Sequence, residues 1–397
     1  MAHFQFFRFF AALALLAASA SGAQATILLS VTKEVTEDTR PADIMLQSAP
    51  LAKYLSAAVG ADIRISYSQN LTEELQNTRT GRFGILFGPA HVIGSALRYG
   101  YQPVAGSPGS EKMVFVVPAD SAIRSLEDLK DQRIGLPSAD SLATYLALGE
   151  FNARGIHAKT YFKEIRYFRL HEVALYSLEL GTIDVAVSDV QVAQKWLAQN
   201  KGRVIYETKA VPALGFAVHT GLDKAVQSKI RDALLSPNSK LPAYAQVAGL
   251  GIGDLRPIAK DDYSYVSTLG YFTPTLISGI KGVTAEEARE LMAKGVPFYD
   301  VRDEREYKEM HVKGAISVPY KEKSGKEIGF DMSKDEFRIA EVVKDKDAPL
   351  IFACNGGECW KSYKASVWAQ KQGYRNIFWF RGGFPEWKGK GLPMQAS

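Results

Sequence analysis

Cysteine is scarce in this chain, with two residues among 397. Secreted domains that depend on disulfides use many more cysteines, so the folded parts must be stabilised by their apolar cores. The sequence also lacks a long basic run and a low-complexity tract, and its net charge is only +5. This composition argues against nucleic acid as a partner and is compatible with small anions. The length predicts roughly two or three domains.

Long apolar runs are missing as well, except at the N-terminus. There Arg8 precedes an apolar run, and small residues then lead to the segment AQA that ends at Ala25. This order predicts a secretory signal peptide over residues 1–25 with an A-x-A cleavage site. The run is shorter than the about 20 apolar residues that a membrane span needs. We therefore expect a periplasmic protein with a cleaved signal peptide, the alternative being a retained N-terminal anchor.

Strand-like and helix-like segments alternate between residues 26 and 268. The runs ATILLSV, ADIRISYS and FGILFG have the pattern of strands, whereas APLAKYLSAAVG and LTEELQNTRTG have that of helices. Such alternation predicts an α/β fold in which parallel sheets are covered by helices on both faces.

Several phrases in this region, taken in order, resemble the phosphate/phosphonate-type periplasmic substrate-binding proteins of ABC importers. They are APLAKYLSAAVG, ILFGPAHV, SAIRSLEDLKDQRIGLPSADS, HEVALYSLELGTIDVAVSD and DDYSYV. The resemblance covers residues 26–268 and implies a two-lobed type II periplasmic binding protein fold with the ligand held between the lobes. The strands that cross between lobes are expected near 107–112 and 208–216, where turn residues precede a return to strand pattern. The implied ligand is a small sulfur or phosphorus oxyanion, and an ABC permease partner is left open.

Two strand-to-helix junctions are candidates for the ligand site, because N–H groups and the helix dipole favour anions there. Gly88 ends one strand, Pro89 is expected at the first position of the next helix, and His91 could offer a charge or a hydrogen bond. Ser138 and Ser141 lie at the other junction and each carries a hydroxyl. The alternatives are that both serines only cap the helix and that His91 is a structural residue.

Two features depart from the pattern of the phosphonate-binding relatives. Those proteins often have a Ser-Thr-Ser-like cluster at this helix start, and here only the hydroxyl of Ser141 remains. Asp189 follows the strand-like run IDVAVSD at a position where the family commonly contacts its ligand. A carboxylate there would repel a dianion but could hold an amine or a protonated oxyanion.

A smaller α/β unit with a parallel sheet is predicted over residues 283–397, after a linker over 269–282. Thr284 and Glu287 predict a capping box ahead of the helix AEEARELMAKG. VPFYDVR, AISVPY, PLIFAC and NIFWF have the pattern of strands, and REYKEM, SKDEFRIAEVVKD and SYKASVWAQKQG that of helices, the last ended by Gly373.

This unit resembles a rhodanese domain from end to end. The motifs that carry the resemblance are Asp300-Val301-Arg302, His311-Val312-Lys313-Gly314-Ala315 and Gly382-Gly383-Phe384-Pro385-Glu386-Trp387. We interpret Asp300, Arg302 and His311 as scaffold residues, because none of them follows the strand that carries the nucleophile.

Cys354 ends the strand PLIFAC and begins a glycine-bearing loop that leads into a helix expected to start near Ser362. The N–H groups of such a loop and the helix dipole would stabilise a thiolate or a persulfide. The resemblance implies that Cys354 takes sulfane sulfur from a donor such as thiosulfate and passes it to a thiol acceptor, with no cofactor and no metal. The expected active-site loop residues are Asn355, Gly356, Gly357, Glu358, Trp360 and Ser362.

Cys359 stands where many rhodaneses close this loop with arginine. The loop therefore looks two residues longer, and Lys361 becomes the expected cation, while the missing arginine argues against a phosphatase. Cys359 could be half of a zinc site, which lacks further ligands at metal spacing, one end of a static disulfide, or a resolving thiol for Cys354.

We thus predict an exported fusion of an oxyanion-binding module and a rhodanese sulfurtransferase. The alternative is an ABC-transporter solute receptor whose rhodanese-like module is inactive or a thiol redox unit.

Overall fold

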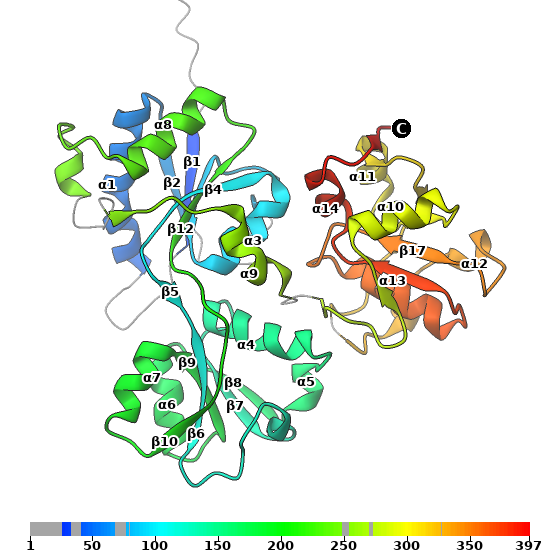
Figure 1. Ribbon diagram of the computed structural model, residues 1–397, viewed down its shortest axis with the longest axis horizontal. Coiled ribbons are helices and arrows are strands. Elements are labelled where there is room, and N and C mark those ends of the chain that lie inside the picture. Colours follow the sequence, from blue (N-terminus) through cyan, green and yellow to red (C-terminus); the bar gives the residue numbers. More distant parts are fainter. Residues whose placement is uncertain are drawn as a thin grey trace, which may run out of the picture.

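The computed structural model describes residues 26–32, 41–67, 77–78, 80–247, 254–269, 273–326 and 328–397. Figure 1 shows two α/β lobes joined by crossing strands, with a third unit beside the first lobe. The predicted signal peptide and most of the helix predicted from LTEELQNTRTG lie outside the described residues. In the part of the chain that is described, no helix is both long and apolar enough to cross a bilayer.

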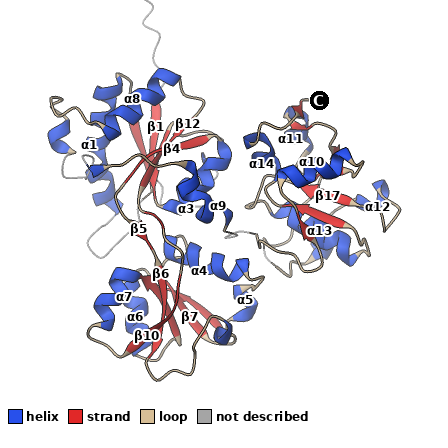
Figure 2. Ribbon diagram, viewed as in Figure 1, coloured by secondary structure: helices blue, strands red, loops and turns tan. Residues whose placement is uncertain are grey.

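The first lobe is built on a five-stranded mixed sheet. Its strands, in spatial order, are β2 (Ile63–Tyr67), β1 (Ile27–Val31), β3 (Ile85–Gly88), β12 (Gly215–His219) and β4 (Tyr101–Gly106). Helices α1 (Pro41–Val59) and α8 (Lys224–Leu235) cover one face, whereas α3 (Ala90–Ala96), the 3₁₀ turn η1 (Leu97–Tyr99) and α9 (Ser264–Thr268) lie on the other (Figure 2). Alternate residues of the strands face opposite cores, since Ile85 packs toward α1 and Leu86 toward α3.

The second lobe repeats this architecture. Its sheet has the order β10 (Gly202–Glu207), β6 (Met113–Pro118), β9 (Val185–Asp189), β7 (Arg133–Leu136) and β8 (Glu164–Tyr167). One face carries α6 (His171–Glu179) and α7 (Val190–Leu197), and the other α4 (Leu142–Ala153) and α5 (Ala158–Tyr161). β6 is apolar along most of its length because both of its faces are buried.

Two short strands form the hinge between the lobes. β5 (Ser110–Glu111) pairs antiparallel with β11 (Val211–Pro212), and these strands lie in the two segments where crossings were predicted. The α/β prediction is confirmed, but the sheets are mixed and not parallel throughout, because β12 is antiparallel to β3 and β4, and β6 is antiparallel to β9 and β10. The reason is the crossing itself: β12 enters from the other lobe beside the end of β3 and so runs the opposite way.

The third unit has the predicted parallel sheet. Its order is β13 (Lys281–Gly282), β18 (Ile377–Phe380), β17 (Leu350–Ala353), β14 (Phe298–Asp300) and β16 (Ile316–Ser317), with every neighbouring pair parallel. A separate pair is formed by β15 (His311–Val312) and β19 (Met394–Gln395). The helices are α10 (Ala285–Ala293), α11 (Glu304–Glu309), α12 (Ile339–Val342), α13 (Trp360–Lys371) and α14 (Gly383–Gly389).

The local signals at the two main helices of this unit are confirmed. Thr284 Oγ1 accepts from the Glu287 N–H at 3.2 Å and Glu287 Oε2 accepts from the Thr284 N–H at 2.9 Å, which is the predicted capping box. Gly373 follows α13 with a φ of 89°, a conformation that glycine adopts without the cost of a side chain.

Two predictions for this unit are wrong. The helix expected over SKDEFRIAEVVKD is reduced to α12 and a 3₁₀ turn, because Glu336 pairs with Lys321 in a backbone bridge that draws the chain out of a helix. The end of the predicted linker is the strand β13, which pairs with β18 and belongs to the third sheet.

Candidate functional site

Cys354 lies directly after β17, at the carboxyl edge of the third sheet. Its side chain is buried, with 1% of the residue exposed, and it faces the first turn of α13. Sγ lies 3.1 Å from Ser362 Oγ, and the Ser362 N–H points at Sγ from 3.4 Å. The indole Nε1 of Trp379 donates to Ser362 Oγ at 3.0 Å and fixes that hydroxyl beside the sulfur.

Glycine is required where the loop is anchored to α14. Gly383 has a φ of 56°, and a Cβ at this position would lie 2.0 Å from the carbonyl oxygen of Cys354. The same carbonyl accepts the Phe384 N–H at 2.9 Å. The close approach of α14 therefore fixes the backbone of Cys354, and the Gly-Gly motif of the sequence is its cause.

The second thiol, Cys359, is the N-cap residue of α13 and is half-buried. The Cys354 thiol donates to the Cys359 carbonyl oxygen at 3.3 Å, so the two cysteines are in contact. Burial, followed by the bond to Cys359, raises the pKa of the Cys354 thiol well above its usual value. The hydrogen bond from Cys354 lowers the pKa of the Cys359 thiol.

The predicted helix start near Ser362 is wrong by two residues. The helix begins at Trp360, because the Cys359 N–H donates to the Gly356 carbonyl at 2.9 Å and closes the loop there. Trp360 and Ser362 consequently belong to α13. The loop was expected to be two residues longer than in many rhodaneses, and this is wrong because the helix already begins after Cys359. Of the N–H groups expected around the sulfur, that of Ser362 contacts it and that of Cys359 closes the turn.

The predicted cation, Lys361, lies in the first turn of α13 and is already paired. Its Nζ is 2.6 Å from Asp303 Oδ1, at the start of α11. Glu306 of the same helix accepts from Asn355 Nδ2 at 2.6 Å. Polar groups of α11 thus hold one side of the loop.

Asp300, Arg302 and His311 form part of the scaffold beside this loop. The buried Arg302 guanidinium pairs with Asp300 at 2.6 Å, donates to the Met310 carbonyl and lies over the Phe384 ring. His311 stacks on Tyr307 with ring centroids 3.8 Å apart. None of these contacts involves Cys354, in agreement with the scaffold interpretation.

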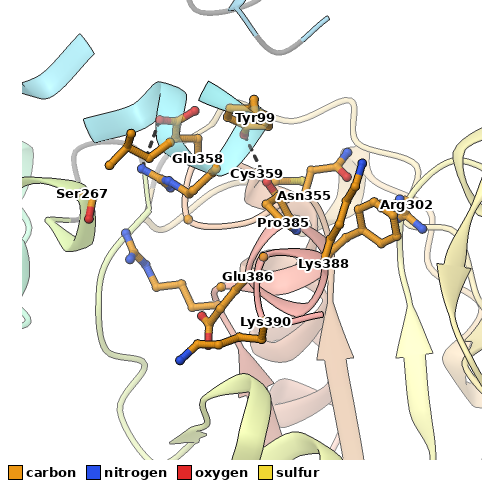
Figure 3. A pocket seen from close by; sticks show the side chains of 18 of the residues that line it. Tyr99, Ser267, Arg302, Asn355, Glu358, Cys359, Pro385, Glu386, Lys388 and Lys390 are labelled. Atoms are coloured by element: carbon orange, nitrogen blue, oxygen red, sulfur yellow. Dashed lines mark hydrogen bonds and ion pairs between the residues drawn. The ribbon is translucent and has the colours of Figure 1, made fainter. Parts of the chain in front are cut away.

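The other side of the loop contacts the first lobe. The Ser95 hydroxyl, on α3, donates to Glu358 Oε1, and the Arg98 guanidinium of η1 lies 3.4 Å from the same oxygen. The Tyr99 hydroxyl donates to the Asn355 carbonyl at 3.3 Å (Figure 3). Sequence reasoning missed these contacts, because no local pattern marks a pairing between residues 263 positions apart.

Two further groups hold the loop from the connecting segment and from the end of β18. The Thr273 hydroxyl donates to the Gly357 carbonyl. Arg381 donates to the carbonyl oxygens of Pro274, at 2.9 Å, and Thr273, at 3.2 Å. Burial, followed by the nearby charge of Arg98, lowers the pKa of Arg381 to about 10. The sequence signal for Arg381 was its position directly after the strand β18.

A cavity of about 1700 Å³ lies between the first lobe and the third unit. Cys359 lines it (Figure 3), and so do more cations than acids. The cations are Arg98, Lys260, Arg302, Arg305, Lys326, Lys361, Arg381, Lys388 and Lys390, and the acids are Asp261, Glu306, Glu309, Glu322, Glu358 and Glu386. The cavity therefore combines a half-buried thiol with an excess of positive charge among these groups.

The predicted ligand residues lie at the junction between the two lobes. Gly88 ends β3 against the end of β1, where a Cβ would lie 3.2 Å from the Thr32 carbonyl oxygen. Pro89 is the N-cap residue of α3 and not its first helical residue, since its ψ of 164° is extended. His91 follows in α3 and has its Nε2 3.2 Å from the carbonyl oxygen of Asp140 in the second lobe.

His91 lies buried at this junction, and its pKa is lowered there. It is 3% exposed and packs on the Tyr145 ring of α4. Burial lowers its pKa to about 4, so it is neutral at pH 7 and offers a hydrogen bond and no charge. Its Nδ1 is buried without a hydrogen-bond partner within the described residues.

The two serines of the second lobe differ in their surroundings. Ser141 is buried and caps α4, because its Oγ accepts the Thr144 N–H at 3.1 Å. The side chain of Ser138 is exposed, and its carbonyl accepts the Ser141 N–H at 2.9 Å. The contact between His91 and Asp140 brings this turn against the start of α3, so the structure does place the two junctions together.

Asp189 caps the neighbouring helix α7. Its Oδ1 accepts the N–H groups of Gln191, at 2.8 Å, and Val192, at 3.3 Å. Because β7 and β9 are adjacent and parallel, Asp189 and the turn around Ser138 follow strand ends at the same edge of the sheet.

Within the described ranges, no cluster of three or more His, Cys, Asp or Glu could hold a metal ion.

Comparisons with known proteins divide the chain in the same way. The family model for the periplasmic substrate-binding protein of phosphonate ABC transporters matches residues 35–263, and the model for the rhodanese-like domain matches residues 284–390. Both resemblances predicted from the motifs are confirmed.

Individual relatives support each half. The chain is 29% identical over 117 residues to the thiosulfate sulfurtransferase GlpE of Haemophilus influenzae, which covers 30% of this chain and 96% of that protein. It is 30% identical over 121 residues to the mitochondrial protein HIGH ARSENIC CONTENT 1 of Arabidopsis thaliana, covering 30% of this chain and 68% of that one. XAC2383 of Xanthomonas citri, solved with chloride bound, shares the fold with a TM-score of 0.50, at 20% identity over 61% of this chain and 96% of that chain.

Proposed function

Because the chain belongs to the family of phosphonate-type periplasmic substrate-binding proteins of ABC transporters, and a rhodanese-like domain follows in the same chain, we propose that it is an exported protein that binds an oxyanion and transfers sulfur. The observation that carries the second activity is the setting of Cys354. This thiol ends a parallel strand beneath a glycine loop, with the N–H and hydroxyl of Ser362 directed at the sulfur.

The first step is attack by the Cys354 thiolate on the sulfane sulfur of a donor such as thiosulfate. The Cys354 proton leaves for this attack, and the Oγ and N–H of Ser362, 3.1 and 3.4 Å from the sulfur, are placed to stabilise the resulting anion. A bond then forms between Cys354 Sγ and the sulfane sulfur, the sulfur–sulfur bond of thiosulfate breaks, and sulfite leaves with the electron pair. Since Ser362 Oγ accepts from Trp379, its own O–H can donate to the resulting anionic sulfur.

The second step returns the enzyme to its starting state. A thiol acceptor, as its thiolate, attacks the outer sulfur of the Cys354 persulfide, so that the acceptor carries the persulfide and Cys354 leaves as a thiolate. No cofactor is needed, because both steps are displacements at sulfur.

The first module is proposed to bind a small phosphorus or sulfur oxyanion between its lobes. The start of α4, with Ser141 at its N-cap, meets the start of α3 across the junction, and His91 is buried there as a neutral group. Gly88 lets the end of β3 approach β1 closely, and Ser138 and Asp189 border the same edge of the second sheet. If the module works as an ABC-transporter substrate-binding protein, it would deliver this ligand to an ABC permease.

A second candidate for the rhodanese-like module is thiol redox chemistry. The contact between the two thiols favours it, because Cys359 could attack the inner sulfur of a Cys354 persulfide and release sulfide. The disulfide formed in this way would need a dithiol reductant to restore the pair.

Sulfur-transfer assays with single variants of the full chain distinguish these candidates. Reduced protein should transfer sulfur from thiosulfate to cyanide, Cys354→Ser should remove this turnover, and Cys359→Ser should keep a measurable part of it. Cys359→Ser is the matched control, since it removes the neighbouring thiol of the same loop. Equal loss in both variants would favour the redox pair, and a Cys354→Ser protein as active as the wild type would refute the assignment.

A further inference from the structure

The catalytic loop is bonded to the substrate-binding domain as well as to its own domain. Glu358 accepts from Ser95 and pairs with Arg98, and the carbonyl of Asn355 accepts from Tyr99. All three donors lie in α3 and η1 of the first lobe. The Glu358 carboxylate is therefore directed away from its own domain and toward the first lobe.

The Glu358 carboxylate is buried in this contact, with 4% of its side chain exposed. The Arg98 side chain is itself 16% exposed, so both charges are largely removed from water. A charge buried in this way is strongly destabilised when its partner is removed. The pair is therefore a fixed attachment between the first lobe and the loop, and not a loose surface contact.

The cavity beside the loop has walls from both domains. Tyr99 lines it from the first lobe and Cys359 from the rhodanese-like domain (Figure 3). Arg98 of the first lobe and Lys361 of the rhodanese-like domain belong to the same lining. Cys354 is almost fully buried behind this loop. A small anion can approach Cys359 and its loop from a cavity in which cations of both domains face it.

We propose that α3 and η1 of the substrate-binding domain form one wall of the sulfurtransferase site, which takes a small anionic sulfur donor of the thiosulfate class. Arg98 is a positioning residue in this site. It holds Glu358, and through it the loop that carries Asn355 to Cys359. This inference rests on the proposed function for the reaction, but the attachment of the loop can be measured without turnover.

Helix α3, which forms part of this wall, also contacts the second lobe at the junction between the lobes. His91, one turn before Ser95 on the same short helix, is bonded to the Asp140 carbonyl of the second lobe. The element that holds the catalytic loop is thus the element that meets the second lobe, and the two modules share it.

The test compares Arg98→Ala with Arg64→Ala in the full chain. Arg64 is a suitable control because it lies on β2 of the same lobe in an exposed pair with Asp62. The readouts are KM and kcat with thiosulfate and the rate at which iodoacetamide alkylates Cys359. We expect Arg98→Ala to raise KM for thiosulfate about tenfold and to change the alkylation rate by about the same factor, the size expected for one charge-assisted contact. Arg64→Ala should change neither.

A double-variant comparison separates positioning from a general loss of charge. If Arg98 acts through Glu358, Arg98→Ala in a Glu358→Gln background should add little to the effect of Glu358→Gln alone. Ser95→Ala, which removes one hydroxyl, serves as a second variant if Arg98→Ala fails to fold, and should shift the alkylation rate in the same direction. Arg98→Ala and Ser95→Ala proteins that match Arg64→Ala in both readouts, or fully additive effects, would overturn the inference.

The outcomes for the two proposals differ. Wild-type turnover with unaffected Arg98→Ala protein overturns the shared wall and leaves the proposed function intact. A changed alkylation rate in a wild-type protein without sulfurtransferase turnover supports the attachment of the loop and overturns the proposed reaction.

Discussion

Replacement of His91 by Gln tests how the junction between the lobes is held together. His91 is buried against Tyr145 and Asp140, and burial lowers its pKa to about 4 from the ordinary 6.5. Gln retains an N–H that can reach the Asp140 carbonyl, but it has no group that titrates in this range. The substitution therefore removes the proton-linked part of the stability and keeps a hydrogen-bond donor.

The sign and size of the effect follow from the two pKa values of His91. Above pH 6.5 the imidazole is neutral in the folded and the unfolded chain, so it adds no pH dependence. As the pH falls from 6.5 toward 4, the unfolded chain binds a proton that the folded chain does not, and stability is lost. With 1.36 kcal/mol for each pKa unit, this loss reaches about 2 kcal/mol at pH 5 and about 3 kcal/mol at pH 4.

The assay is thermal unfolding of the full chain at pH 7.5 and pH 5, for the wild type and His91→Gln. About 2 kcal/mol corresponds to roughly 4–8 °C in the Tm of a domain of this size. We expect the wild type to lose this much more than His91→Gln on acidification. Parallel pH profiles for the two proteins would refute the claim that His91 is held neutral at the lobe junction.

Two further predictions concern the ligand and the thiol pair. Asp189→Asn should keep α7 capped, because Asn is as good an N-cap as Asp, and it should strengthen the thermal shift caused by a dianion such as phosphate or thiosulfate; an unchanged shift would show that Asp189 does not face the ligand. Air-oxidised protein should show fewer than two free thiols in a thiol titration, and a mild reductant should restore both, because Cys354 and Cys359 are in contact; two free thiols after oxidation, without a persulfide, would exclude the redox pair.

Local patterns predicted the parts of the fold that depend on neighbours in sequence. The strand-helix alternation and the capping box at Thr284 appear in the structure. The two crossings were implied by the family resemblance, and turn residues placed them near 107–112 and 208–216, where they are found. Each depends on side-chain period, turn residues or a contact within one helical turn. Such features can be read from the residues that form them.

Features that depend on distant partners could not be predicted in this way. The helix expected over SKDEFRIAEVVKD is cut short because Glu336 pairs with Lys321, and nothing in its own sequence indicates that backbone bridge. The antiparallel strands β6 and β12 likewise follow from the path of the chain between lobes.

The candidate site shows the same division. Cys354 and Ser362 were identified from the strand, the glycines and the helix that follow one another in sequence, and they do lie together. Arg98 and Ser95 could not be identified, because their role exists only once two domains are in contact. Lys361 was expected to be the cation of the loop, and its pairing with Asp303 depends on the placement of another helix.

The central claim is that Cys354 carries sulfur, and the position of that sulfur can be measured directly. The full chain, as wild type, Cys354→Ser and Cys359→Ser, is incubated with thiosulfate, freed of excess donor and examined by intact-protein mass spectrometry. The account predicts the added mass of one sulfur atom on the wild type and on Cys359→Ser, lost again on addition of cyanide, and no added sulfur on Cys354→Ser. Added sulfur on Cys354→Ser at the wild-type level, with none on Cys359→Ser, would contradict it and assign the nucleophile to Cys359.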